Sequence, residues 1–204
     1  NQKIEKSISV SFADSVRDLE RNGEVILKLQ TGEPYFKTHK NIIKSAYNAL
    51  NKGYTKYSDS RGLISLRREI SKKLLIKNKI KANPLTNILI TNGAVHGISI
   101  AIKAIVKKGD EVVILEPYWK AYESCVLLSG GVPKILNTKE DNFNLNTNLI
   151  ESALTSKTKL VIINSPNNPS GSIYNKEQLN NAIRDIINNG AKIIIGPPTS
   201  SFAS

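Results

Sequence analysis

Apolar residues recur along the chain at two different spacings, and the two spacings alternate from residue 40 onward. A spacing of three and four residues is typical of amphipathic helices, and short continuous apolar runs between turn residues are typical of buried strands. The helical spacing predicts helices over 40–51, 61–78, 94–106, 119–128 and 149–154, and a last helix capped by Asn175 with Gln178 three residues on. The apolar runs predict strands at 87–91, 112–115, 133–136, 160–163 and 191–195. This alternation predicts an α/β fold with a mainly parallel sheet that helices cover on both faces.

The first forty residues differ from the rest of the chain. They are polar, contain a loop signal from Gly32 to Pro34, and precede the alternation of strands and helices. We therefore expect residues 1–40 to form an N-terminal arm and small-domain segment, and residues 41–204 to form an α/β domain.

Composition excludes several classes of protein. Of the 204 residues, 40% are hydrophobic, which is too many for a disordered chain. The single cysteine, Cys125, excludes a disulfide framework and a four-thiolate metal centre, and we predict no metal site. The apolar run at 100–106 is interrupted by Lys103 and is far shorter than the ~20 residues of a membrane span. Because the N-terminus also lacks the pattern of a signal peptide, we expect a cytoplasmic protein with no membrane partner.

The charge balance raises the possibility of a nucleic-acid partner. Lys and Arg number 29 against 17 Asp and Glu, which leaves a formal net charge of +12. The basic residues are spread along the chain, and in the densest stretch, 72–81, lysines alternate with apolar residues. That pattern favours the solvated face of a helix, and no zinc-finger spacing or RNA-binding aromatic strand is present. We therefore predict no nucleic-acid partner and keep a basic nucleic-acid-binding domain as an alternative.

Candidate chemistry is expected beyond the carboxyl ends of the strands, where parallel sheets bind ligands. Asn92 and Gly93 follow the run at 87–91 and lead into a helix. The free N–H groups and the dipole of such a helix favour a phosphate, although the same junction can be a plain tight turn. The only tryptophan, Trp119, follows the next strand, where an indole can stack on a planar ring or simply pack under a loop.

A rigid loop of turn-forming residues, 164–171, follows the strand at 160–163. Its two prolines restrict the backbone, so Asn168 projects with little conformational entropy left to lose. A phosphate cradle, a stacking ring and a fixed amide together describe a pocket for a flat, phosphorylated heteroaromatic cofactor.

The segment Ser165-Pro-Asn-Asn-Pro-Ser-Gly171 resembles the signature loop of the class I/II aminotransferases, the pyridoxal-phosphate-dependent enzymes of fold type I. Further segments resemble the family in its order and roughly its spacing, over about residues 20–195: Leu29-Gln-Thr-Gly-Glu-Pro-Tyr-Phe36, Tyr54-Thr-Lys-Tyr57 with Gly62 and Leu66-Arg67, Thr91-Asn-Gly-Ala94, and Asp110-Glu-Val-Val-Ile-Leu-Glu-Pro-Tyr-Trp119. The resemblance implies an aspartate-aminotransferase-like enzyme that moves an amino group between an amino acid and a 2-oxo acid by a ping-pong route. It also implies that 41–204 is part of the large cofactor-binding domain.

The resemblance assigns cofactor-binding roles to residues that follow the predicted strands. Gly93, Ala94 and Val95 fall on the turn whose backbone holds the cofactor phosphate. Trp119 falls on the ring that stacks against the pyridine, and Asn168 falls on the amide that hydrogen-bonds the phenolic oxygen of the cofactor. The cofactor so implied is pyridoxal 5′-phosphate.

Two more residues match family positions outside the α/β pattern. Gly32 falls on the loop that approaches the α-carboxylate of the substrate, and Tyr57 falls on the tyrosine that reaches the phosphate of the neighbouring subunit's site. The latter implies a homodimer. His39, His96 and Cys125 match no family role, and we interpret them as structural.

Two groups that pyridoxal-phosphate chemistry requires are missing from the matching motifs. The family's carboxylate partner of the pyridinium nitrogen follows the strand at 191–195, typically as Asp-Glu-x-Tyr, yet no Asp, Glu or Tyr occurs after Asp185. No lysine lies in a motif that matches the family's Schiff-base lysine, so we identify no catalytic residue. We expect the N-terminal half of an aminotransferase, truncated before that lysine. The alternatives are a catalytically inactive fragment or binding protein of the same fold, and another fold-type-I activity such as a lyase or decarboxylase.

Overall fold

The computed structural model describes residues 8–28, 32 and 35–196. Residues 197–204, where the family pattern would place the acidic cofactor partner, lie outside the described residues, as do 29–31 and 33–34 of the loop motif. The chain divides into two compact units, one of residues 1–32 with 98–204 and one of residues 33–97. The boundary expected at residue 40 stays a prediction.

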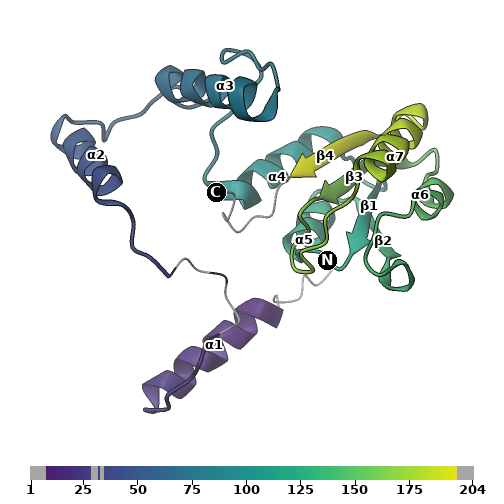
Figure 1. Cartoon of the computed structure of the whole chain (residues 1–204), viewed down its shortest axis with the longest axis horizontal. Coiled ribbons are helices and arrows are strands. Elements are labelled where there is room, and N and C mark those ends of the chain that lie inside the picture. The colour runs from purple at the N-terminus through teal and green to yellow at the C-terminus, as the bar shows by residue number, and fades with distance from the viewer. Residues whose placement is uncertain (1–7, 29–31, 33–34, 197–204) are drawn as a thin grey trace. The chain divides into compact units, whose positions relative to one another are not determined.

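A parallel sheet of four strands organises the larger unit (Figure 1). The strands are β1 (Glu111–Glu116), β2 (Val132–Asn137), β3 (Thr158–Asn164) and β4 (Lys192–Gly196). Their order is β2-β1-β3-β4, with β1 in the centre paired to β2 and β3, and β3 paired in turn to β4. The predicted α/β fold with a mainly parallel sheet is therefore confirmed.

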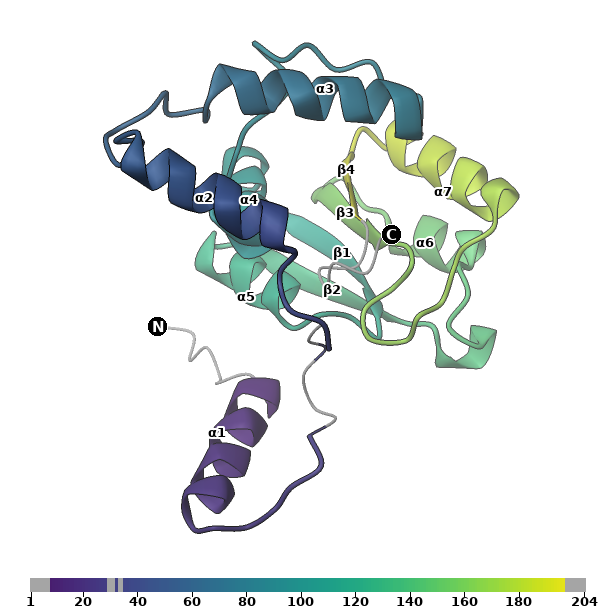
Figure 2. The same ribbon diagram turned by 60° about the vertical axis from the view of Figure 1, so that its left-hand side comes forward.

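Helices cover both faces of this sheet (Figure 2). Successive strand residues point to opposite faces, so Val112 and Ile114 belong to one apolar cluster while Val113 and Leu115 belong to the other. The first cluster also takes in residues of α4 (Gly93–Ile105) and α5 (Ala121–Leu128), and the second takes in residues of α6 (Thr147–Ala153) and α7 (Lys176–Asn188). Full burial of each such side chain contributes about 1.5–3 kcal/mol, so this two-faced packing is the main source of stability in the unit.

The start of α7 is fixed by a capping box, as the sequence predicted. The Asn175 side chain accepts a hydrogen bond from the Gln178 backbone N–H at 2.8 Å, and the Gln178 side chain accepts one from the Asn175 backbone N–H at 3.4 Å. These bonds satisfy N–H groups that the first turn of a helix leaves without intrahelical acceptors.

The unit of residues 33–97 contains α2 (Lys40–Asn51) and α3 (Ile64–Asn78), close to the predicted ranges. The strand predicted at 87–91 is wrong, because these residues pair with no neighbouring strand. The N–H of Ile90 instead donates to the carbonyl of Arg61 at 3.0 Å. A Cβ at Gly62, whose φ is +90°, would lie 2.3 Å from Ile90, so this close approach requires glycine there.

Within residues 1–40, for which we predict an N-terminal arm and small-domain segment, the structure has a helix, α1 (Ile8–Arg21). Ion pairs at i,i+3 spacing, Asp14 with Arg17 and Asp18 with Arg21, lie along it. In the part of the chain that the structure describes, no helix has the length and apolar character needed to cross a bilayer.

Candidate functional site

The connections on the two sides of the sheet diverge between β1 and β3. From β1 the chain passes through α5 to β2, and from β3 it passes through α7 to β4 on the opposite side of the sheet. Adjacent parallel strands whose connections leave in opposite directions open a crevice at their carboxyl ends, and this is where open α/β sheets bind ligands. The loops that follow Glu116 and Asn164 therefore form the candidate site.

Trp119 lies in the first of these loops, three residues after β1 ends. It is half-buried, packs against the apolar cluster that contains Val112 and Ile114, and meets the ring of Tyr122 edge-on, with the ring centroids 5.7 Å apart at 86°. This T-shaped contact fixes the orientation of the indole. The stacking role that the resemblance implies for Trp119 stays a prediction.

A charged cluster flanks Trp119. The Tyr118 hydroxyl donates to Glu123 Oε2 at 2.7 Å, and Lys120 forms an ion pair with the same carboxylate. Burial and this hydrogen bond raise the pKa of Tyr118, so the hydroxyl stays protonated. Burial opposes the ionisation of Glu123, but the bonds from Lys120 and Tyr118 outweigh it and hold the Glu123 pKa below its ordinary value.

Three asparagines lie at the end of β3 and in the loop that follows it. Asn164, at the end of β3, accepts from the Asn168 backbone N–H at 2.9 Å and donates to the Gly196 carbonyl at 2.9 Å. Asn167 is buried, and its side-chain NH₂ donates to the carbonyl of Pro117 and to the hydroxyl of Ser170, both at 2.8 Å. Asn168 is half-buried. The structure thus brings the loops of Trp119 and Asn168 into direct contact.

The predicted phosphate turn lies in the other unit, at the N-terminus of α4. Gly93 has φ +81°, and no atom lies within 4 Å of the position that a Cβ would take there. Its own N–H donates to the carbonyl of Thr91 at 2.9 Å, so Ala94 and Val95 carry the first-turn N–H groups that remain for an anion. All three turn residues are exposed.

The three residues interpreted as structural make local contacts or are buried. His96 Nδ1 accepts from the Asn92 backbone N–H at 3.1 Å and closes the turn before α4, and His39 caps α2 through the Asn41 N–H. Cys125 is buried, which raises the pKa of its thiol.

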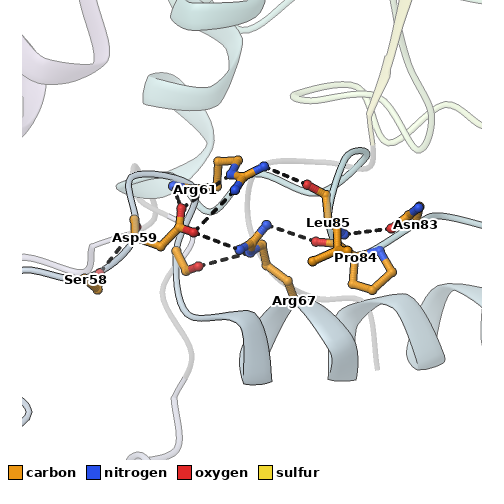
Figure 3. Close-up of polar contacts among 8 residues, drawn as sticks. Ser58, Asp59, Arg61, Arg67, Asn83, Pro84 and Leu85 are labelled. Carbon is orange, nitrogen blue, oxygen red and sulfur yellow. Dashed lines mark hydrogen bonds and ion pairs between the residues drawn. The ribbon is translucent and has the colours of Figure 1, made fainter.

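Tyr57 and Gly32 are both exposed, and Tyr57 shows the full accessibility of a free side chain, at 107%. Tyr57 lies two residues before Asp59, which belongs to a hydrogen-bonded cluster (Figure 3). At its centre Arg67, only 1% exposed, donates to the carbonyls of Gly62 and Pro84, both at 3.0 Å, and to Asp59 Oδ2 at 3.3 Å. This cluster fixes the chain beside Tyr57.

The model for the family described as aminotransferase class I and II matches residues 24–195. The chain belongs to the class I and II aminotransferase family. The resemblance found in the sequence and the predicted fold class are thereby confirmed.

Individual relatives agree with this assignment. The aspartate aminotransferase of Bacillus sp. (strain YM-2) is 35% identical over 189 residues, which cover 92% of this chain and 48% of the relative. That of Geobacillus stearothermophilus is 37% identical over 174 residues, which cover 85% and 44%. The solved aspartate aminotransferase from Thermus thermophilus with maleate is 31% identical with a TM-score of 0.91, and the match covers 95% of this chain and 51% of that chain. The chain spans about half the length of the curated relatives that it matches.

The residues present fit the cofactor of an aminotransferase. Trp119 and Asn168 are each partly accessible, and they lie in the two loops that the Asn167–Pro117 bond joins. The open space at Gly93 leaves the N-terminus of α4 accessible to a phosphate. Because the turn and the crevice belong to different units, each supports this fit separately.

Sequence reasoning did not single out Asn164, Asn167 or Arg67, although Asn167 and Arg67 lie in segments that resemble the family and Asn164 directly precedes one. Arg67 carries a signal, since it stands four residues after Leu63 and three before Ile70, on the apolar stripe of α3. A charged residue that is buried on such a stripe requires partners. The two asparagines carry a weaker signal, because polar residues that directly follow a buried strand are common in plain turns.

Proposed function

We propose that this chain supplies the cofactor-binding half of a pyridoxal-phosphate-dependent aminotransferase, which moves an amino group between an amino acid and a 2-oxo acid. The observation that carries the proposal is the direct contact between the loops of Trp119 and Asn168 beyond the carboxyl ends of β1 and β3, in a chain of this family. When bound, pyridoxal phosphate supplies an electron sink for bond changes at the α-carbon of the amino acid.

Each predicted site residue has a distinct task in this proposal. Trp119 provides a flat apolar surface for the pyridine ring, held in orientation by Tyr122. Asn168 donates a hydrogen bond from its amide to the phenolic oxygen. The N-terminal turn of α4 at Gly93, Ala94 and Val95 holds the phosphate through its N–H groups and the helix dipole.

The proposal extends to the substrate and to a second subunit. Gly32 lets the backbone approach the α-carboxylate of the substrate, and Tyr57 reaches the phosphate in the neighbouring subunit of a cytoplasmic homodimer. The full exposure of Tyr57 supports a partner outside its own chain. Aspartate is the first amino acid to test, since several relatives are named aspartate aminotransferases and one was solved with maleate, a dicarboxylate.

Because Trp119 is the only tryptophan, its fluorescence reports on the candidate site directly. We expect saturable quenching when the chain is titrated with pyridoxine 5′-phosphate, whose alcohol replaces the aldehyde and cannot condense with surface lysines. Asn168→Ala should weaken binding about tenfold, the effect of one lost hydrogen bond to a charged or polarised oxygen. Asn180→Ala, on the exposed surface of α7, is the matched control and should bind as the parent chain does. Absence of saturable quenching in the parent chain would overturn the proposal.

Reductive labelling separates a catalytic site from a binding site. After incubation with pyridoxal 5′-phosphate and borohydride, we expect label dispersed over several lysines, because no lysine of the chain lies in the matching family motif. Peptide mass mapping would reveal a single dominant labelled lysine, and that result would contradict the expectation and place a catalytic lysine within these 204 residues.

A further inference from the structure

We propose that Asn167 is a positioning residue that holds the ring of Trp119 and the amide of Asn168 on the two sides of one ligand site. The inference rests on the proposed function, because it concerns how the chain arranges the two groups assigned to the cofactor.

The carboxamide of Asn167 joins two loops that are fifty residues apart in the sequence. One N–H bond of its NH₂ group reaches the carbonyl of Pro117, which starts the loop after β1, and the other reaches Ser170 in its own loop. Both bonds are 2.8 Å long, and the residue is only 7% exposed. A buried amide that loses such acceptors is left without solvent as a substitute, so the arrangement is strongly favoured over alternatives.

The loop that carries Asn167 is itself closed. The Asn167 backbone N–H donates to the Ser172 carbonyl at 2.9 Å, and its carbonyl accepts from the Gly171 N–H at 2.8 Å. These two bonds hold the backbone of Asn167 in place and so limit the directions that its side chain can take. Asn164 also fixes the backbone of Asn168, because its side-chain oxygen accepts a hydrogen bond from the Asn168 N–H.

The bridge joins the two loops that carry the residues assigned to the ligand. Pro117 follows the end of β1 and precedes Trp119 by two residues, while Asn167 immediately precedes Asn168. The single Asn167–Pro117 bond therefore sets the separation between the stacking ring and the donor amide. A ligand that contacts both gains affinity when they are held in place beforehand, since it does not have to order them on binding.

Two substitutions at Asn167 and one control test this role. Asn167→Ala removes both side-chain bonds. Asn167→Asp keeps the shape of the side chain but replaces the donor with a carboxylate that cannot donate to the Pro117 carbonyl. This variant provides the test if the alanine variant does not fold. Ser170→Ala removes the bond from Asn167 and the two bonds between Ser170 and Ser172, all within the loop, and leaves the bridge to Pro117 intact, so it is the matched control.

The first measurement uses no cofactor. Acrylamide quenching and anisotropy of Trp119 fluorescence should show a more accessible and more mobile indole in both Asn167 variants, and an unchanged one in Ser170→Ala. Far-UV circular dichroism and a urea transition establish that each variant is folded. A Trp119 signal unchanged in both Asn167 variants, or changed equally in Ser170→Ala, would overturn the inference.

The second measurement is titration with pyridoxine 5′-phosphate. We expect about tenfold weaker binding in each Asn167 variant and parent-like binding in Ser170→Ala. Equal affinity in all four chains overturns the inference while leaving the proposed function intact. A parent chain that does not bind overturns the proposed function, and the cofactor-free fluorescence then still decides whether Asn167 holds Trp119.

Discussion

Arg67 is the clearest case of a single residue on which its surroundings depend. Its guanidinium is fully buried and reaches two backbone carbonyls and the Asp59 carboxylate, so it connects the segments around Asp59, Gly62 and Pro84 (Figure 3). Only the planar, forked guanidinium can make these three bonds at once, because a lysine ammonium is a compact point charge on a flexible stem.

We predict that Arg67→Lys lowers the free energy of unfolding by about 3 kcal/mol, since roughly two charge-assisted hydrogen bonds are lost. Urea denaturation followed by circular dichroism measures the change. The neighbouring Arg68 is exposed, so Arg68→Lys is the matched control and should leave the transition in place. Equal transitions for both variants would show that the Arg67 bonds contribute little.

Asp59 gives the same cluster a pH dependence. The bonds from the backbone and side chain of Arg61, followed by the charges of Arg61 and Arg67, hold the Asp59 pKa below its ordinary value of 3.8 and outweigh the desolvation that raises it. A carboxyl group whose folded pKa is lowered stabilises the fold above its unfolded pKa, and that contribution disappears as the pH falls through the folded pKa.

Asp59→Asn should therefore be less stable than the parent chain at pH 7, and the difference should shrink as the pH falls below about 4. Urea transitions at neutral and acidic pH, compared between the two chains, measure it. A stability difference that stays constant with pH would contradict the role of the ionised carboxylate.

Among the helices and strands, the sequence correctly predicted the four strands that form the sheet, but the strand that it predicted at 87–91 is wrong. Val112–Leu115 and Leu160–Ile163 are buried on both faces, so their continuous apolar pattern has a simple physical origin. The run at 87–91 has a similar pattern but no strand beside it, and its Ile90 N–H bonds to a turn at Arg61. An apolar run indicates that side chains are buried. A strand also requires a hydrogen-bonded neighbour, and the local sequence pattern does not show whether one is present.

The candidate site shows the same limit. Trp119 and Asn168 could be predicted because a lone tryptophan and a proline-framed amide stand out in a sequence. The bridge from Asn167 to Pro117 could not, because it joins residues fifty positions apart and depends on which strands are neighbours.

The capping box of α7 allows a prediction at the same scale. Asn175→Ala removes the acceptor for the Gln178 N–H and should lower the free energy of unfolding by about 1 kcal/mol. Asn175→Asp retains an acceptor oxygen and should keep most of the stability of the parent chain. Asn180→Ala, in the exposed interior of the same helix, should cost nothing, since alanine favours helix. A loss in Asn180→Ala equal to that in Asn175→Ala would assign the effect to the helix in general rather than to its cap.

Across the whole molecule, apolar surface is distributed unevenly. The sheet of the larger unit is covered on both faces, yet α2 buries no residue, and Ile42, Ile43, Tyr47 and Leu50 on one side of it are each 56–64% exposed. Contiguous exposed apolar surface of this kind promotes association with other protein surfaces. The net charge of +12 opposes association between copies in general, so an apolar face must outweigh this repulsion where copies meet.

We predict that Ile43→Lys with Tyr47→Lys shifts the purified chain toward monomer, as measured by sedimentation velocity. Asn41→Lys with Asn48→Lys adds the same charge to the opposite, polar side of α2 and is the matched control. Because no residue of α2 is buried, neither pair should change the far-UV circular dichroism spectrum. If both pairs shift the distribution equally, charge repulsion alone explains the effect; if only the first does, the apolar face of α2 is the surface through which copies of the chain associate.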